Sequence, residues 1–174
     1  IKFKKFTDNF ARFNVTPGDV DWFDSFESIL NNARVGGWVV KEAGVKGIMF
    51  DIETYGVPIW HYAKQKHAST KSYEEYAAQV HKRGYEVMKA FEANYPAITI
   101  FFSFADSFIC MREQYPDPYI EGPNSFTLTS NDPRKLRYVG YGLLPAFIDG
   151  MLEAAGPDVR LIDGSEFTYL YRDP

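Results

Sequence analysis

The chain has almost no cysteine: Cys110 is the only one among its 174 residues. A single thiol excludes an internal disulfide framework and a cysteine-rich zinc site. Histidine is also scarce, and His61, His67 and His81 follow neither an H-x-H nor an H-E-x-x-H pattern. We therefore expect no metal and no cofactor.

Long apolar runs and an excess of basic charge are missing as well. No stretch of the sequence approaches the ~18 apolar residues that a membrane-spanning helix needs, so we expect no membrane partner. Lysine and arginine total 19 against 23 acidic residues, which gives a formal net charge of -4. Such a balance does not attract a phosphate backbone, and we expect no nucleic-acid partner.

Aromatic residues are what the sequence has in excess. They make up 17% of the chain, within a hydrophobic content of 45% that excludes wholesale disorder. Part of the excess fills a core, and the tyrosines and tryptophans also suit a cleft that stacks flat ligands such as sugars.

The first residue is Ile1 and no signal peptide is recognisable, so we expect a processed chain or part of a longer protein. Localisation stays open between a secreted or periplasmic and a cytoplasmic protein.

Helices and strands are expected to alternate along the chain. Each expected helix ends at a glycine or a proline and leads into an apolar strand. Ser72 and Glu75 form a capping box at the start of the clearest helix. Gly36 and Gly37 predict a break or a kink in the first helix, because glycine is a poor helix former. The expected helices cover about 22–43, 73–93 and 145–155, and the expected strands cover about 10–15, 47–53, 98–104 and 159–163.

This alternation predicts an α/β protein with a parallel sheet and right-handed crossovers. An open doubly wound sheet and a (β/α)8 barrel of the TIM type are the two candidates. No glycine-rich phosphate-binding motif follows any strand, which disfavours a nucleotide-binding open sheet. A full barrel takes ~250 residues, so we expect residues 1–174 to form a single, partial barrel. Its open edges predict self-association or coverage by the remainder of a longer chain.

Asp51 and Glu53 stand at the end of the expected strand over 47–53. Side chains alternate between the faces of a strand, so these two acids share one face. The carboxyl end of a parallel strand is where such folds carry their chemistry. A second acid nearby raises the pKa of a carboxyl group, as a proton donor at neutral pH requires. The alternative is a solvated loop start in which Asp51 caps the chain and Glu53 is exposed.

Further acids follow the next two expected strands, namely Asp106, Asp163 and Glu166. Glycoside hydrolysis uses two carboxyl groups, one protonated and one ionised. We therefore expect Glu53 to be the general acid and Asp51 to raise its pKa or orient it. Glu166 is the first candidate for the second catalytic carboxylate, and Asp163 is the reserve.

Residues close to these acids are candidates for substrate binding. Aromatic rings on a rim loop can stack on the faces of sugars. For the aromatic members, local packing of the loop is the alternative. The candidates are Tyr55, Trp60, Tyr62, Ser103 and Asp106.

The stretch from Ala43 to Tyr55 resembles bacterial TIM-barrel proteins of the glycoside hydrolase type. In those proteins a helix ending in A-G-x-K-G leads into a strand ending in F-D-x-E-x-Y, and this chain has both patterns. The segments around Arg83-Gly84 and Leu143-Leu144-Pro145 fit the same family. The resemblance covers most of residues 20–171. It implies a barrel, a carbohydrate substrate and Glu53 as the leading catalytic residue.

Two other functions remain open at this point. Phe50-Asp51-Ile52-Glu53-Thr54 is also similar to the first motif of proofreading 3′–5′ exonucleases, where the acids hold two divalent metals. In that fold a β-hairpin follows the motif, whereas here a long helix is expected. The other alternative is a non-catalytic carbohydrate-binding or structural barrel segment.

Overall fold

The computed structural model describes residues 6–15, 18–105 and 136–164. The described part contains four strands, three α-helices and one short 3-10 helix. In chain order these are β1 (Phe10–Asn14), α1 (Glu27–Glu42), β2 (Gly47–Asp51), η1 (Tyr62–Lys64), α2 (Tyr73–Glu92), β3 (Thr99–Phe102), α5 (Leu144–Ala154) and β4 (Arg160–Asp163).

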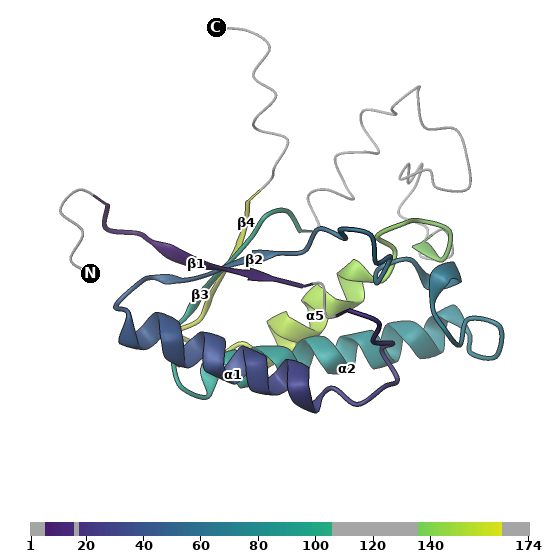
Figure 1. Ribbon diagram of the computed structural model, residues 1–174, viewed down its shortest axis with the longest axis horizontal. Coiled ribbons are helices and arrows are strands. Elements are labelled where there is room, and N and C mark those ends of the chain that lie inside the picture. Colours follow the sequence, from purple (N-terminus) through teal and green to yellow (C-terminus); the bar gives the residue numbers. More distant parts are fainter. Residues whose placement is uncertain (1–5, 16–17, 106–135, 165–174) are drawn as a thin grey trace, which may run out of the picture.

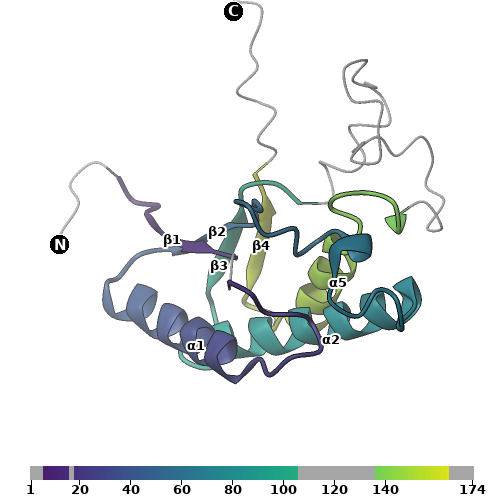
Figure 2. The same ribbon diagram turned by 45° about the vertical axis from the view of Figure 1, so that its right-hand side comes forward.

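The strands form one parallel sheet in the order β1-β2-β3-β4. Consecutive strands are neighbours, and α1, α2 and α5 all lie on the same side of the sheet (Figures 1 and 2). The predicted α/β class, the parallel pairing and the element order are therefore confirmed. Among the described residues the sheet is open, with β1 at one edge and β4 at the other.

Alternation along the strands decides which side chains form the core. Ile48 and Phe50 of β2 pair in register with Ile100 and Phe102 of β3, and all four are at most 2% exposed. They face the helices, since successive side chains of a strand point to opposite faces. The intervening positions, among them Met49 and the two acids, belong to the face that no described helix covers.

Helix α1 differs from the expectation at two points. It begins at Glu27 rather than near 22, although Trp22 and Phe26 are still buried in the core from the preceding loop. The helix also runs without a break through Gly36 and Gly37. At Gly37 an added Cβ would overlap the backbone carbonyl of Phe91. The expected break was wrong because the glycine allows α1 and α2 to approach closely, and this packing outweighs its poor helix propensity.

Helix α2 agrees closely with the expectation from sequence. Its N-cap Ser72 accepts a hydrogen bond from the Glu75 amide, and the Glu75 carboxylate accepts one from the Ser72 amide, so the predicted capping box is present. The helix follows η1 and leads into β3, which is parallel to β2. Residues 54–72 thus contain no strand, and the hairpin that an exonuclease fold requires after Glu53 is not there.

Helices α2 and α5 cross at two glycines. A Cβ on Gly84 would overlap the Phe147 carbonyl, and a Cβ on Gly150 would overlap the His81 carbonyl. Each helix therefore presents a glycine to the backbone of the other.

The buried side chains of the sheet and the helices form one hydrophobic cluster. None of the described helices combines the length and the apolar character needed to cross a membrane.

Candidate functional site

A pocket of about 220 Å³ lies on the uncovered face of the sheet, toward the carboxyl ends of the strands. Residues from all four strands or the segments that follow them contribute to it. Its lining consists of Arg12, Met49, Asp51, Glu53, Tyr55, Phe101, Ser103 and Gly164. The structure thus brings together four residues that the sequence singled out, namely the two acids, Tyr55 and Ser103.

Asp51 is held by its neighbours and is 2% exposed. Its Oδ2 accepts a hydrogen bond of 2.9 Å from Arg12 Nε and a second from Arg12 Nη2. Its Oδ1 accepts a hydrogen bond of 3.1 Å from the Glu53 amide. The ion pair raises the pKa of Arg12. Asp51 is therefore a buried carboxylate whose charge is compensated, and it fixes the backbone that carries Glu53.

Glu53 also lines the pocket, but its side chain is only half-buried. The Glu53 carboxyl group interacts with the Tyr55 hydroxyl, and this interaction is the main reason that the pKa of Tyr55 rises to about 12. At neutral pH the tyrosine is protonated, so its hydroxyl can donate to the carboxyl group. Tyr55 is 57% exposed, which leaves its ring open to a ligand at the edge of the pocket.

The neighbouring strand and a tyrosine outside the pocket hold the chain around Glu53 in place. Ser103 Oγ accepts a hydrogen bond of 3.4 Å from the Ile52 amide, which ties the end of β3 to the end of β2. Tyr141, 8% exposed, lies 3.4 Å through its hydroxyl from both the amide and the hydroxyl of Thr54. These contacts hold the segment on which Glu53 and Tyr55 stand.

Two predicted sugar-binding residues lie elsewhere. Trp60 is 0% exposed, and its indole N–H donates a hydrogen bond of 2.8 Å to the Ile52 carbonyl. The half-buried Tyr62 packs edge-on against Tyr73 and Tyr76, and its hydroxyl bonds backbone carbonyls. A ring with no accessible face cannot stack on a ligand, so the expectation for Trp60 was wrong. The packing of the loop accounts for both residues.

The reserve carboxylate Asp163 does not line the pocket. It pairs in register with Phe102, whose side chain faces the helices, whereas Asp51 and Glu53 belong to the opposite face. Its Oδ1 accepts a hydrogen bond of 3.1 Å from the Ala105 amide. Asp163 therefore organises the end of β3, and Gly164 is the residue of this segment that reaches the pocket. Asp106 and Glu166, the other two predicted site residues, lie outside the described residues.

Arg12 is the site residue that sequence reasoning missed. It stands in the strand Phe10–Asn14 between apolar neighbours, on the same face as Phe10 and Asn14. The signal available in the sequence was a cation at an alternate position of an apolar strand, which could have indicated a partner for the acids of the next strand.

Within the described residues no three His, Cys, Asp or Glu side chains gather as a metal site.

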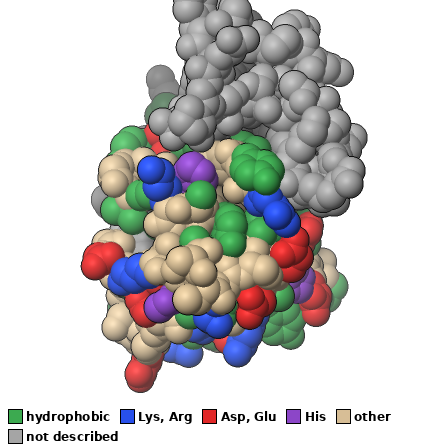
Figure 3. Space-filling view, turned by 90° about the vertical axis from the view of Figure 1, so that its right-hand side faces the viewer, with side chains coloured by type: hydrophobic (Ala, Val, Ile, Leu, Met, Phe, Trp, Pro, Cys, Tyr) green, Lys and Arg blue, Asp and Glu red, His purple; other side chains and the backbone are tan. Residues whose placement is uncertain are grey.

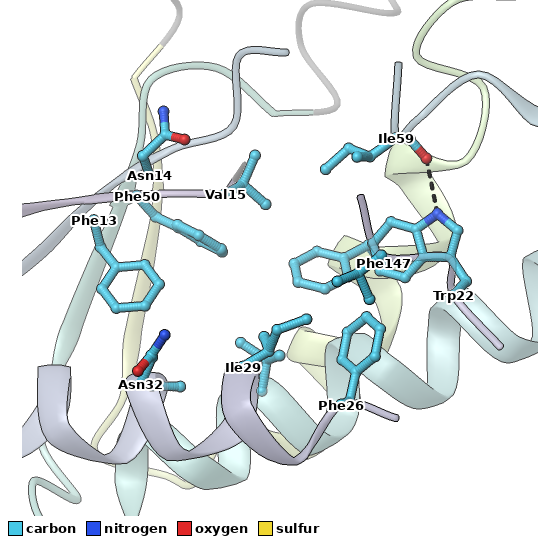
Figure 4. A pocket seen from close by; sticks show the side chains of 13 residues that line it. Phe13, Asn14, Val15, Trp22, Phe26, Ile29, Asn32, Phe50, Ile59 and Phe147 are labelled. Atoms are coloured by element: carbon cyan, nitrogen blue, oxygen red, sulfur yellow. Dashed lines mark hydrogen bonds between the residues drawn. The ribbon is translucent and has the colours of Figure 1, made fainter. Parts of the chain in front are cut away.

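A second hollow lies between the sheet and α1 and has a different character (Figure 4). Its volume is about 110 Å³, and its described lining is apolar apart from Asn14 and Asn32. Phe13 and Phe50 extend toward it from the strands, and the Trp22 indole bonds the Ile59 carbonyl across 2.8 Å at its far end (Figure 4). Without an acid or a base in this lining, the hollow offers no catalytic group.

The charges on the surface show no dominant sign in the view of Figure 3. On that face acidic and basic side chains are interspersed, with hydrophobic side chains between them.

No protein-family model matches the chain, and neither the curated proteins nor the solved structures contain a match to it. The pocket around Glu53 is therefore the basis for any proposal about function.

Proposed function

We propose that the chain is one half of a (β/α)8 barrel and that it hydrolyses glycosidic bonds with Glu53 as proton donor. The parallel order β1-β2-β3-β4 with every described helix on one face supports the barrel. In such a barrel the uncovered face of the sheet is the interior, and the carboxyl ends of the strands form the catalytic rim. The pocket around Glu53 lies at that rim.

The proposal is carried by the difference in accessibility between Asp51 and Glu53. Both carboxylate oxygens of Asp51 accept hydrogen bonds within the protein and the residue is only 2% exposed, so it offers almost no accessible surface to a substrate. Glu53 lines the open pocket beside the exposed Tyr55. Glu53 is thus the acid of the pair that can reach a glycosidic oxygen.

In the proposed reaction Glu53 transfers its proton to the leaving oxygen as the glycosidic bond breaks. The protonated Tyr55 hydroxyl beside it is proposed to donate a hydrogen bond to the other carboxyl oxygen of Glu53 and so to orient the group. Arg12 neutralises Asp51, so a sugar that enters the pocket does not meet an uncompensated negative charge beside the protonated Glu53. The second carboxyl group of the mechanism is proposed to be Glu166, which either attacks the anomeric carbon to form a glycosyl-enzyme that water then hydrolyses, or takes a proton from the water that attacks this carbon.

The test compares substrates that differ in their need for a proton. Wild-type protein is assayed on a panel of oligosaccharides and on aryl glycosides with activated leaving groups. Glu53→Gln keeps the shape of the side chain and removes the acid, so kcat on the oligosaccharide should fall by about 10²–10⁴-fold with KM little changed. Activated aryl glycosides, which need little protonation, should lose much less.

The exposed Glu42 on α1 provides the matched control, and Glu42→Gln should leave both rates unchanged. Equal rates for Glu53→Gln and wild type on natural and activated substrates would show that Glu53 is not the acid. If the wild-type protein binds oligosaccharides and hydrolyses none, the chain is a carbohydrate-binding segment and the catalytic proposal fails.

A further inference from the structure

The hollow between the sheet and α1 has walls made largely of aromatic rings (Figure 4). Phe13 and Phe50, which pair in register on β1 and β2, form one side, with ring centroids 5.9 Å apart. Trp22 and Phe26, which precede α1, form the opposite side, with centroids 5.7 Å apart. The Phe147 ring of α5 lies 6.2 Å from that of Phe50 and 5.8 Å from that of Trp22. Aromatic rings therefore border the space of about 110 Å³ on three sides.

Aliphatic side chains complete the apolar lining. Ile29 and Ala33 contribute from α1, and Val15 and Ile59 contribute from the segments after β1 and β2. None of the described residues in the lining carries a charge. Protein interiors have few voids larger than a water molecule, and an engineered apolar cavity of about 150 Å³ stays dry and binds benzene. An apolar ligand in this hollow would gain contacts without displacing well-bound water.

The polar side chains of the lining are confined to one end. Asn14 and Asn32 lie beside Phe13, at the end opposite Trp22 (Figure 4). Both asparagines are exposed, whereas Trp22 and Phe26 are 5% and 6% exposed. The hollow is therefore buried at its tryptophan end and reaches solvent at its asparagine end. Two side-chain amides at this opening can donate to, and accept from, an uncharged polar group.

We propose that the hollow is a binding site for a small uncharged aromatic molecule with one six-membered ring and one polar substituent. The ring occupies the buried end, and the substituent lies at Asn14 and Asn32. Rings that meet face to edge attract each other beyond the effect of the apolar area that they bury, which favours an aromatic ring over a saturated one. A charged ligand is disfavoured, because the described lining offers nothing to compensate its charge.

This site is separate from the pocket around Glu53. That pocket lies on the uncovered face of the sheet, whereas the hollow lies on the face that the helices cover. The two share no lining residue among those described. The inference therefore goes beyond the proposed function and does not depend on hydrolytic activity. Glu53→Gln should bind the aromatic molecule as the wild type does, so the two proposals can fail independently.

Phenol is the probe, and cyclohexanol and benzoate are its matched comparisons. Phenol should bind the wild-type chain saturably, with a dissociation constant on the order of 1 mM, as expected for a ligand with so few atoms. Cyclohexanol lacks the aromatic ring and should bind about 3-fold more weakly or worse. Benzoate carries a charge and should bind about 10-fold more weakly or worse. Binding of either comparison as tight as that of phenol would overturn the proposal.

Nuclear magnetic resonance locates the bound phenol. The indole N–H of Trp22 bonds the Ile59 carbonyl at the buried end of the hollow, so its signal should shift as phenol binds. Trp38 does not line the hollow, and its indole signal should stay in place. The absence of a saturable shift at Trp22, or a shift at Trp38 alone, would contradict the assigned site.

Filling the hollow tests its location independently. Ile29→Phe and Val15→Phe each enlarge a half-buried side chain of the lining, on two different segments. Each variant should keep the wild-type circular dichroism spectrum and raise the dissociation constant for phenol by about 10-fold or more. Ile162→Phe is the matched control, because it makes the same change on β4 outside the lining, and it should keep the wild-type affinity. Wild-type affinity in both filled variants would show that phenol binds elsewhere.

N-acetylphenylalaninamide distinguishes a free molecule from a side chain of a partner protein. It carries the same ring on a polypeptide backbone, and the hollow has room for about one ring, so the two amide groups must stay at the opening. This compound should bind about 10-fold more weakly than phenol or worse. Tighter binding than phenol would assign the hollow to an aromatic side chain of another protein and overturn the proposal.

Discussion

At the scale of single residues, burial and charge compensation separate the roles of neighbouring acids. Asp51 and Glu53 share a strand face, yet one is enclosed by Arg12 and a backbone amide and the other lines open space. The sequence shows two acids at the right spacing, but not the cation on β1 that neutralises the first. That partner is 39 residues away in the chain, and only the pairing of β1 with β2 brings it near.

The ion pair between Arg12 and Asp51 can be measured by a double-mutant cycle. Arg12→Met leaves a buried carboxylate without its cation and should lower the melting temperature. Asp51→Asn removes the charge and should destabilise as well. The double variant should be more stable than the sum of the single losses predicts, because neither charge is then left alone. Thermal unfolding of the four proteins gives the coupling energy, and Arg34→Met, on an exposed position of α1, serves as the control. A coupling energy of zero would contradict the assigned role.

His61 predicts how stability depends on pH. Burial lowers the pKa of His61 from its ordinary value of 6.5, and Lys64 contributes in the same direction. The unfolded chain therefore binds a proton at His61 more readily than the folded one. The contribution of the neutral His61 to the free energy of unfolding is fully present above pH 6.5 and is lost as the pH falls toward the pKa of the folded state. The melting temperature of the wild type should fall between pH 7 and pH 5 more steeply than that of His61→Gln. His67→Gln, at an exposed position, should follow the wild type.

At the scale of elements, local signals predicted the strands and α2 well. The capping box of Ser72 and Glu75 acts within four residues, so sequence alone determines the start of α2. The first helix was predicted, but the break expected at its glycines was wrong, because the partner of Gly37 is the backbone of Phe91 on another helix. Trp60 was assigned to the rim for a related reason: its neighbours in sequence are loop residues, while its contacts are core residues such as Phe147. Long-range packing decided both cases, and no local pattern encodes it.

The crossing of α2 and α5 gives a prediction at this scale. Gly84→Ala and Gly150→Ala each insert a methyl group where the other helix has backbone, and backbone cannot rotate away as a side chain can. Each change should therefore lower the free energy of unfolding by about 1–3 kcal/mol or more. Lys82→Ala, on the exposed side of α2, should stay within about 0.5 kcal/mol of wild type. Urea denaturation of the three variants measures these differences, and full stability of either glycine variant would mean that the helices can move apart freely.

At the scale of the whole molecule, the described residues form a sheet with one face covered by helices and one face open. The sequence predicted the α/β class and the parallel sheet, because the alternation of helices and strands requires parallel pairing. It predicted only part of the set of residues that meet on the open face, since the whole set depends on the register of all four strands. The pocket residues Arg12 and Gly164 became visible only through that register.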